Sequence, residues 1–176
     1  KRLTTLHAEH GIGYLAAPVL GRIDVAAAGK LNILAAGDSE RLKQAQPLFD
    51  ALGQKTWHFG ADPAQANVVK IATNFTLASA IEAMAEGSAL VRNYGVSGAD
   101  YLQMLSSTVF AAPAYQGYGA LIAAEKYSPA GFRLALGLKD VGLALAAGAD
   151  SHTPMPFAGV LKDNFLEDRK STRLNS

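Results

Sequence analysis

The longest regular pattern of the chain, Gly60 to Asn93, predicts one continuous helix that is mostly apolar. Asp62 followed by Pro63 is a strong start signal, because aspartate caps helix N-termini and proline fits the first helical position. Gly87 weakens the pattern, but apolar residues resume after it, so we expect the helix to continue until Gly95. The rest of the chain is predicted to be organised around this helix.

A patch of polar residues interrupts the apolar pattern near the start of this helix. Asn67, Lys70 and Asn74 are spaced i, i+3 and i+7, which places them within an arc of about 60° on an α-helix. Burial among apolar neighbours lowers the pKa of a lysine, as an acid–base catalyst near neutral pH requires. The residues alone leave two interpretations of Lys70 open, a catalytic group and a lysine that extends its ammonium to solvent. The apolar neighbours are Val68, Val69, Ile71, Phe75 and Leu77.

Before this helix, short apolar runs alternate with helical patterns, which predicts an α/β arrangement. Pro18 has no N–H to donate to a sheet, so the first strand should end there. Asp38 or Ser39 should cap the helix that follows the second strand. The expected strands are Tyr14–Val19, Leu31–Ala36 and Lys55–Phe59, and the expected helices are Lys1–Glu9 and Glu40–Leu52.

After the long helix the pattern is helical throughout. The expected helices are Asp100–Ser107, Pro113–Lys126, Phe132–Ala149 and Phe157–Phe165. The fold class predicted from the pattern is therefore an α/β region, then a long helix, then an all-α half.

Composition narrows the function classes. A hydrophobic content of 49% with 18% charged residues is typical of a globular protein. The absence of cysteine excludes disulfides and thiolate metal sites, and the four histidines show no metal-binding spacing. A net charge of +1 without a basic run gives no footprint for nucleic acid. No apolar run has the length needed to cross a bilayer, so we expect no membrane association.

Both ends of the chain need comment. Residues 1–10 resemble a helix already in progress, so we expect the chain to begin inside a larger protein. The last nine residues, 168–176, change character abruptly and match the translation of a sequencing adapter. We interpret them as a non-native tail and leave them out of the fold.

Two other places carry candidate chemistry. Lys139 and Asp140 interrupt an otherwise apolar helical pattern, either as functional groups or as a solvated pair at the helix edge. The loop Pro18–Arg22 contains Gly21, which permits close approach of the backbone to a ligand, and Arg22, which suits a carboxylate. An ordinary surface connection is the alternative for this loop. The chain has neither a Gly-x-Ser-x-Gly elbow nor a P-loop, so hydrolysis and nucleotide triphosphate chemistry lack support.

Four motifs in this order and spacing resemble the β-hydroxyacid dehydrogenases, which include 3-hydroxyisobutyrate dehydrogenases and glyoxylate/succinic semialdehyde reductases. The resemblance covers residues 1–166, and its most distinctive part is the Lys-x-x-x-Asn motif with the residues before it. The motifs are Tyr14–Gly21, Ala28–Leu31, Asn67–Asn74 and Lys139–Asp140.

The resemblance implies a domain organisation. Residues 1–61 would be the trailing strands of an NAD(P)-binding Rossmann domain, most of which is absent because no Gly-x-Gly-x-x-Gly follows a strand here. Residues 62–167 would be the interdomain helix and a helical domain like the C-terminal domain of 6-phosphogluconate dehydrogenase. The family also implies a homodimer or homotetramer formed through the helical domain, a small-molecule substrate and a cytoplasmic location.

The resemblance also implies site residues and a cofactor, NADP or NAD with NADP favoured, and no metal. Lys70 would be the general acid/base and Asn74 would help to fix the substrate. The expected substrate-binding residues are Leu20, Gly21, Arg22 and Asn67, and the expected cofactor-binding residues are Lys139, Asp140 and Phe132.

Two departures from the family pattern bear on the substrate. The family's Ser-Gly-Gly after Ala-Pro-Val is Leu20-Gly21-Arg22 here, which loses a serine contact and gains an arginine. The glycines usual before the lysine are Ala64 and Ala66. Two alternative functions are an imine reductase of the same fold and a catalytically silent scaffold. Lys70 argues against both, because each class usually lacks this lysine.

Overall fold

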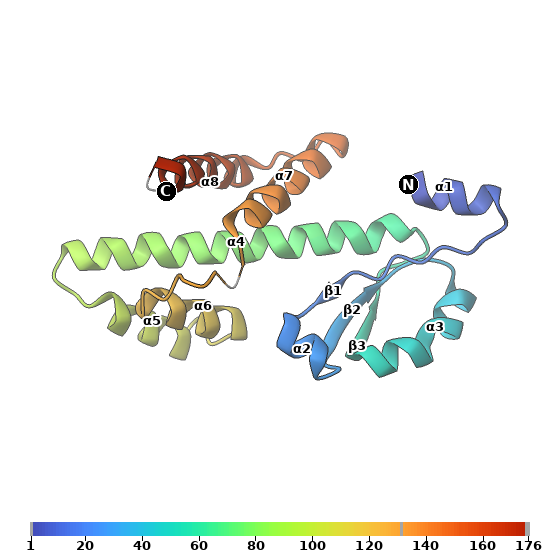
Figure 1. The fold of residues 1–176 in the computed structure, drawn as a ribbon, viewed down its shortest axis with the longest axis horizontal. Helices are drawn as coiled ribbons and strands as arrows, with labels where there is room; N and C mark the ends of the chain where they lie inside the picture. The colour runs from blue at the N-terminus through green and yellow to red at the C-terminus, as the bar shows by residue number, and fades with distance from the viewer. Residues whose placement is uncertain (1, 131, 175–176) are drawn as a thin grey trace. The chain divides into compact units, whose positions relative to one another are not determined.

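The computed structural model describes residues 2–130 and 132–174. The chain forms two compact units, Lys1–Ala72 and Thr73–Ser176 (Figure 1). The first unit contains a three-stranded sheet with helices, and the second is helical. The predicted fold class, an α/β remnant followed by a long helix and an all-α part, is confirmed.

The sheet of the first unit has the order β1-β2-β3. β1 (Val19–Leu20) pairs antiparallel with β2 (Leu31–Ala35), and β2 pairs parallel with β3 (Gly53–His58). Helix α3 (Ser39–Leu52) connects the two parallel strands, and Asp38 caps it by accepting a hydrogen bond from the backbone N–H of Arg41. The other helices of this unit are α1 (Arg2–Glu9) and α2 (Ile23–Ala27).

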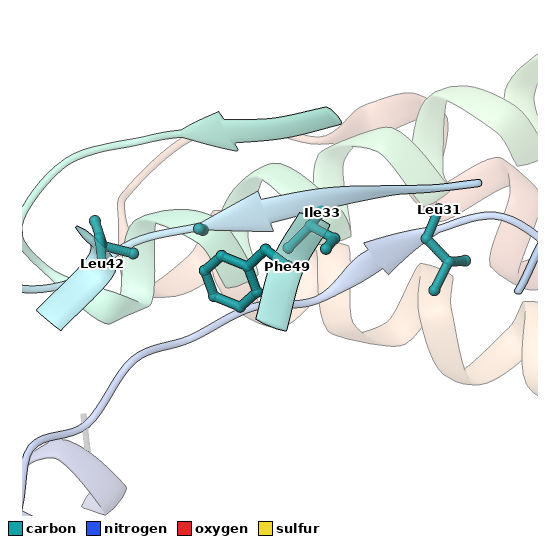
Figure 2. Packing of buried hydrophobic residues seen from close by; sticks show 5 residues of the cluster. Leu31, Ile33, Leu42 and Phe49 are labelled. Carbon is teal, nitrogen blue, oxygen red and sulfur yellow. The ribbon is translucent and has the colours of Figure 1, made fainter. Parts of the chain in front are cut away.

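The core of the first unit lies between β2 and α3. Alternate residues of β2, Leu31 and Ile33, face Leu42 and Phe49, which lie seven residues apart on one side of α3 (Figure 2). The opposite face of the sheet is covered differently. Ala36, directly after β2, is fully buried and packs with Ala16, Ala66 and Phe59.

The first predicted strand, Tyr14–Val19, is wrong in its bounds. The structure has an isolated bridge between Ala16 and Ala36, and a regular strand only at Val19–Leu20. The strand therefore begins directly after Pro18 and does not end there. Pro18 lacks an N–H, but its carbonyl oxygen accepts a hydrogen bond from the N–H of Leu34, so the segment still follows β2.

Helix α4 (Pro63–Asn93) confirms the long helix predicted from the pattern (Figure 1). Asp62 caps its start, with one carboxylate oxygen accepting from the backbone N–H of Ala64 at 2.9 Å. The side chain of Gln65 accepts from the N–H of Asp62 in return, as in a capping box. The helix runs through Gly87, and Gly95 beyond its end has a positive φ of 79°.

Helix α4 is also the one described helix with the length and apolar composition to cross a membrane. The prediction that no run of the chain reaches this length is therefore wrong for α4. The measure concerns length and composition only, and core helices of soluble proteins also meet it.

The second unit contains two helix pairs, α5 with α6 and α7 with α8. Met84 and Leu102 are buried beside Gly119, and Val141, Ala158 and Leu161 form a separate cluster. The helices are α5 (Gly98–Ser107), α6 (Pro113–Ala123), α7 (Leu134–Asp150) and α8 (Pro156–Leu174).

Several predicted helix ends are wrong. Helix α6 ends three residues before Lys126, and α7 begins two residues after Phe132. Helix α8 continues from the predicted end at Phe165 to Leu174, into the segment interpreted as a tail. A helix that has already formed extends readily, because each further residue adds a backbone hydrogen bond without the cost of nucleation. Lys1 and residues 175–176, which belong to predicted segments, lie outside the described residues.

We predict that Leu161→Ala lowers the free energy of unfolding by about 2–5 kcal/mol, because it removes a fully buried side chain and leaves a cavity. Leu166→Ala on the same helix is the matched control, since that leucine is 37% exposed and should cost much less. Urea denaturation of both variants measures the difference. Equal losses would contradict the described packing of α8.

Candidate active site

The expected substrate loop lies at the edge of the sheet in the first unit. Leu20 belongs to β1 and pairs with Asn32, and Gly21 follows with a φ of 141°. A Cβ on Gly21 would lie 2.7 Å from Leu31 and 2.8 Å from Val25, so both the conformation and the space require glycine.

Arg22 directly precedes α2 and is exposed. Its side chain does not cap that helix and makes no hydrogen bond or ion pair with any residue that the structure describes. An exposed guanidinium without such contacts can donate two parallel hydrogen bonds to a carboxylate.

Asn67 and Lys70 lie on the first turns of α4. Asn67 is exposed, and its side-chain N–H₂ donates to the backbone oxygen of Pro63 at 3.4 Å. Lys70 is half-buried. The expected apolar surroundings of Lys70 are incomplete, because Val68 is 52% exposed.

In the second unit, Asn74, Lys139 and Asp140 form one hydrogen-bonded group. Asn74 Nδ2 donates to Asp140 Oδ2 at 2.9 Å, and Lys139 Nζ lies 2.6 Å from Asp140 Oδ1. The Asp140 side chain is 14% exposed, whereas that of Lys139 is 59% exposed. The group therefore joins a sheltered carboxylate to an amide on α4 and to an ammonium at the surface.

The contact between Asn74 and Asp140 is a pairing of expected site residues that sequence reasoning missed. The two residues are 66 positions apart, and the pairing depends on how α7 lies against α4. No local spacing reveals it. The signal in the sequence is that Asp140 stands next to Val141 in an apolar stretch. In the structure Val141 is completely buried, so Asp140 lies close to the packed face of α7.

Phe132 lies before α7 and is 52% exposed. Its ring packs over Gly137, where an added Cβ would be 3.6 Å from the ring. Gly137 is one helical turn before Asp140, so Phe132 covers the same end of α7 as the Lys139–Asp140 pair.

Two cavities lie in the first unit, and the walls of one include Val68 and Val69, the residues between Asn67 and Lys70. One cavity of about 380 Å³ lies between α1 and the starts of α3 and α4, and includes Gly13, Tyr14 and Arg41. Another of about 450 Å³ lies at the start of α4, between Phe59 and Val68. Among residues 2–130 and 132–174, no group of three or more histidine or acidic side chains could hold a metal ion.

Comparison with known proteins shows to which family the chain belongs. Residues 64–171 match the family described as NAD-binding of NADP-dependent 3-hydroxyisobutyrate dehydrogenase. Residues 1–60 match the NAD binding domain of 6-phosphogluconate dehydrogenase. The chain belongs to the β-hydroxyacid dehydrogenase family. The resemblance seen in the sequence motifs is thus confirmed.

Individual members of this dehydrogenase family match most of the chain. YfjR, an uncharacterized oxidoreductase of Bacillus subtilis, is 42% identical over 165 residues, which are 94% of this chain and 57% of YfjR. The structure of 3-hydroxyisobutyrate dehydrogenase from Mycobacterium tuberculosis with L-serine has 27% identity and a TM-score of 0.82, and the match covers 94% of this chain and 59% of that one. The chain therefore spans less than three-fifths of the length of these two proteins.

Imine reductases share the dehydrogenase fold. The imine reductase of Streptomyces aurantiacus has a TM-score of 0.54 at 20% identity, covering 97% of this chain and 60% of that one. A likeness at this identity concerns the fold alone.

We predict that Gly21→Ala destabilises the first unit by roughly 1–3 kcal/mol, because alanine at a φ of 141° is strained and its Cβ meets two side chains. Gly142→Ala is the matched control. This helical glycine has open space around an added Cβ, so the substitution should be neutral or stabilise the protein by up to about 1 kcal/mol. Thermal unfolding of both variants tests the difference, and a neutral Gly21→Ala would contradict the described loop.

Proposed function

We propose that this chain forms the substrate-binding part of an NAD(P)-dependent oxidoreductase that interconverts a small β-hydroxy acid and the corresponding aldehyde or keto acid. The observation that carries the proposal is the Asn74 amide, which Asp140 holds at 2.9 Å. Lys70 lies four residues before Asn74 on α4, which is one helical turn. The family membership of the chain supports the same reaction class.

Lys70 is the general acid/base of the proposed reaction. When bound, the nicotinamide supplies or accepts a hydride at its C4. In the reductive direction the Lys70 ammonium donates a hydrogen bond to the substrate carbonyl oxygen and then its proton, which neutralises the developing alkoxide. In the oxidative direction the neutral amine removes the proton of the hydroxyl group.

The substrate-binding residues of the proposal recognise a carboxylate. Arg22 supplies a charged fork, and the Gly21 backbone permits close approach. Asn67 adds an exposed amide on α4. The L-serine in the Mycobacterium tuberculosis structure is a 3-hydroxy carboxylate, which supports this substrate class.

The residues present fit one side of a nicotinamide. Phe132 offers an exposed aromatic ring, and Lys139 offers an exposed ammonium whose partner is Asp140. The glycine-rich phosphate loop of dinucleotide-binding domains is not part of this sequence. We therefore assign Lys139, Asp140 and Phe132 to the nicotinamide end of NADP or NAD.

An imine reductase is the second candidate, because proteins of that class share the fold. Lys70 argues against it, since imine reductases usually carry another residue at the corresponding position. A cyclic imine and a 3-hydroxy acid, assayed side by side with the same enzyme, distinguish the two. The cytoplasmic location and the homodimer or homotetramer formed through the helical part stay predictions.

We predict that Lys70→Ala in the full-length enzyme that contains this chain lowers kcat by roughly 10²–10⁴-fold, the usual contribution of a general acid/base. Binding of NAD(P)H, measured by fluorescence, should change little. Lys70→Arg should be nearly as inactive, because arginine keeps the charge but does not release its proton. Lys162→Ala, which removes an exposed lysine of α8, is the control. Full turnover of Lys70→Ala would refute the assigned role.

We also predict that residues 1–176 alone do not bind NADPH measurably, because they lack the phosphate-binding loop. Titration calorimetry with NADPH at up to millimolar concentration tests this. A Kd in the micromolar range would show that the chain holds the dinucleotide without a Gly-x-Gly-x-x-Gly loop, and the proposed division of the site would be wrong.

A further inference from the structure

The hydrogen bond between Asn74 and Asp140 determines which atom of the Asn74 amide faces Asp140. An ionised carboxylate can only accept hydrogen bonds, so the amide atom that faces Asp140 must be Nδ2 and not Oδ1. This assignment follows from the chemistry of the pair, since exchanging the two amide atoms would bring an oxygen against a carboxylate oxygen.

The two oxygens of Asp140 have different partners. Oδ1 is taken by the ammonium of Lys139 at 2.6 Å, and Oδ2 accepts from Asn74. Because the Asp140 side chain is only 14% exposed, its charge depends on these partners for compensation. The ion pair with Lys139 holds Oδ1, so Oδ2 is the oxygen of Asp140 that faces Asn74 on α4.

We propose that Asp140 is a positioning residue that holds Asn74 as a hydrogen-bond acceptor toward the reacting group, with its carbonyl oxygen Oδ1 as the acting atom. This inference rests on the proposed function. It differs from the expected roles, in which Asp140 belonged to the cofactor side and Asn74 helped to fix the substrate through an unspecified contact.

An acceptor at this position has a chemical consequence for the lysine one turn earlier. A neutral lysine amine has two N–H donors and one lone pair. If one N–H of Lys70 donates to Asn74 Oδ1, the lone pair is directed elsewhere and is available for the proton of a substrate hydroxyl. In the reductive direction the same oxygen accepts from the ammonium and leaves another N–H for the substrate carbonyl. A donor at residue 74 would instead repel the ammonium hydrogens.

A reciprocal exchange of the two side chains tests the direction of the hydrogen bond. In Asn74→Asp the two carboxylates oppose each other, and we expect kcat to fall at least about 100-fold in the full-length enzyme. Asp140→Asn lets the amide of Asn74 turn over, and we expect a fall of about 10- to 100-fold. In the double variant, the amide now at position 140 donates to the carboxylate now at position 74, whose second oxygen again offers an acceptor to the reacting group. We expect its kcat to be at least about tenfold above that of Asn74→Asp.

The exchange separates an acceptor from a donor, because an aspartate side chain at position 74 has no N–H. If Asn74 acts by donating to the substrate, the double variant stays as inactive as Asn74→Asp, which would overturn the proposal. The pH profile gives a second measure. A carboxylate at position 74 favours the ammonium form of Lys70, so the double variant should need a higher pH for half-maximal oxidation than the wild type.

Two control variants make the same substitutions at positions outside the group of Asn74, Lys139 and Asp140. Asn93→Asp at the end of α4 and Asp150→Asn at the end of α7 alter exposed side chains and should leave kcat within about twofold. Melting temperatures complete the design. A double variant that regains stability but not kcat over Asn74→Asp shows a merely structural contact and overturns the positioning role.

Failure of the proposed function is distinguishable from failure of this inference. If Lys70→Ala keeps full turnover, the acid/base assignment falls, and with it the catalytic meaning of the Asn74 acceptor. If Lys70→Ala is inactive and the exchange does not restore kcat, only the role of Asp140 and Asn74 is refuted.

Discussion

Close packing of three alanines places the start of α4 on the sheet. Ala16, Ala36 and Ala66 are at most 4% exposed and form one cluster with Phe59. Side chains of a single carbon let a helix approach a strand closely, and a larger residue at position 66 would move the helix outward. Lys70 follows one turn later, so the placement of the proposed acid/base relative to the sheet depends on this contact.

The sequence predicts α4 well because its determinants are local. Asp62 and Pro63 define the start through capping chemistry, and Gly95 supplies the positive φ beyond the end. The position of β1 could not be predicted in the same way. Pro18 suggests the end of a strand, but antiparallel pairing uses its carbonyl oxygen, and only the partner strand reveals this.

The candidate site is likewise predictable from the sequence where its determinants are local, and not where they depend on distant residues. The spacing of Lys70 and Asn74 on one helix follows from the sequence, and the motif resemblance identifies the family. The bond from Asn74 to Asp140 does not follow, because a contact across 66 residues depends on the packing of two helices. For a related reason, the sequence predicts more apolar burial around Lys70 than the structure shows. A helical pattern shows which residues are apolar, but not which of them, such as Val68, stay in contact with solvent.

The order of the sheet has a consequence for handling the protein. Among the described residues, β1 and β3 each pair on one side only, so both outer margins of the sheet carry backbone N–H and C=O groups without a partner strand. Such margins are templates for strand addition between molecules. Pro18 does not protect the outer margin of β1, because its carbonyl oxygen, and therefore also its nitrogen, faces β2. In β3, the charged Lys55 lies over the ring of the partly exposed Trp57. A lysine at the edge of a sheet opposes strand addition, so replacing Lys55 with an apolar residue would favour association of separate molecules along β3.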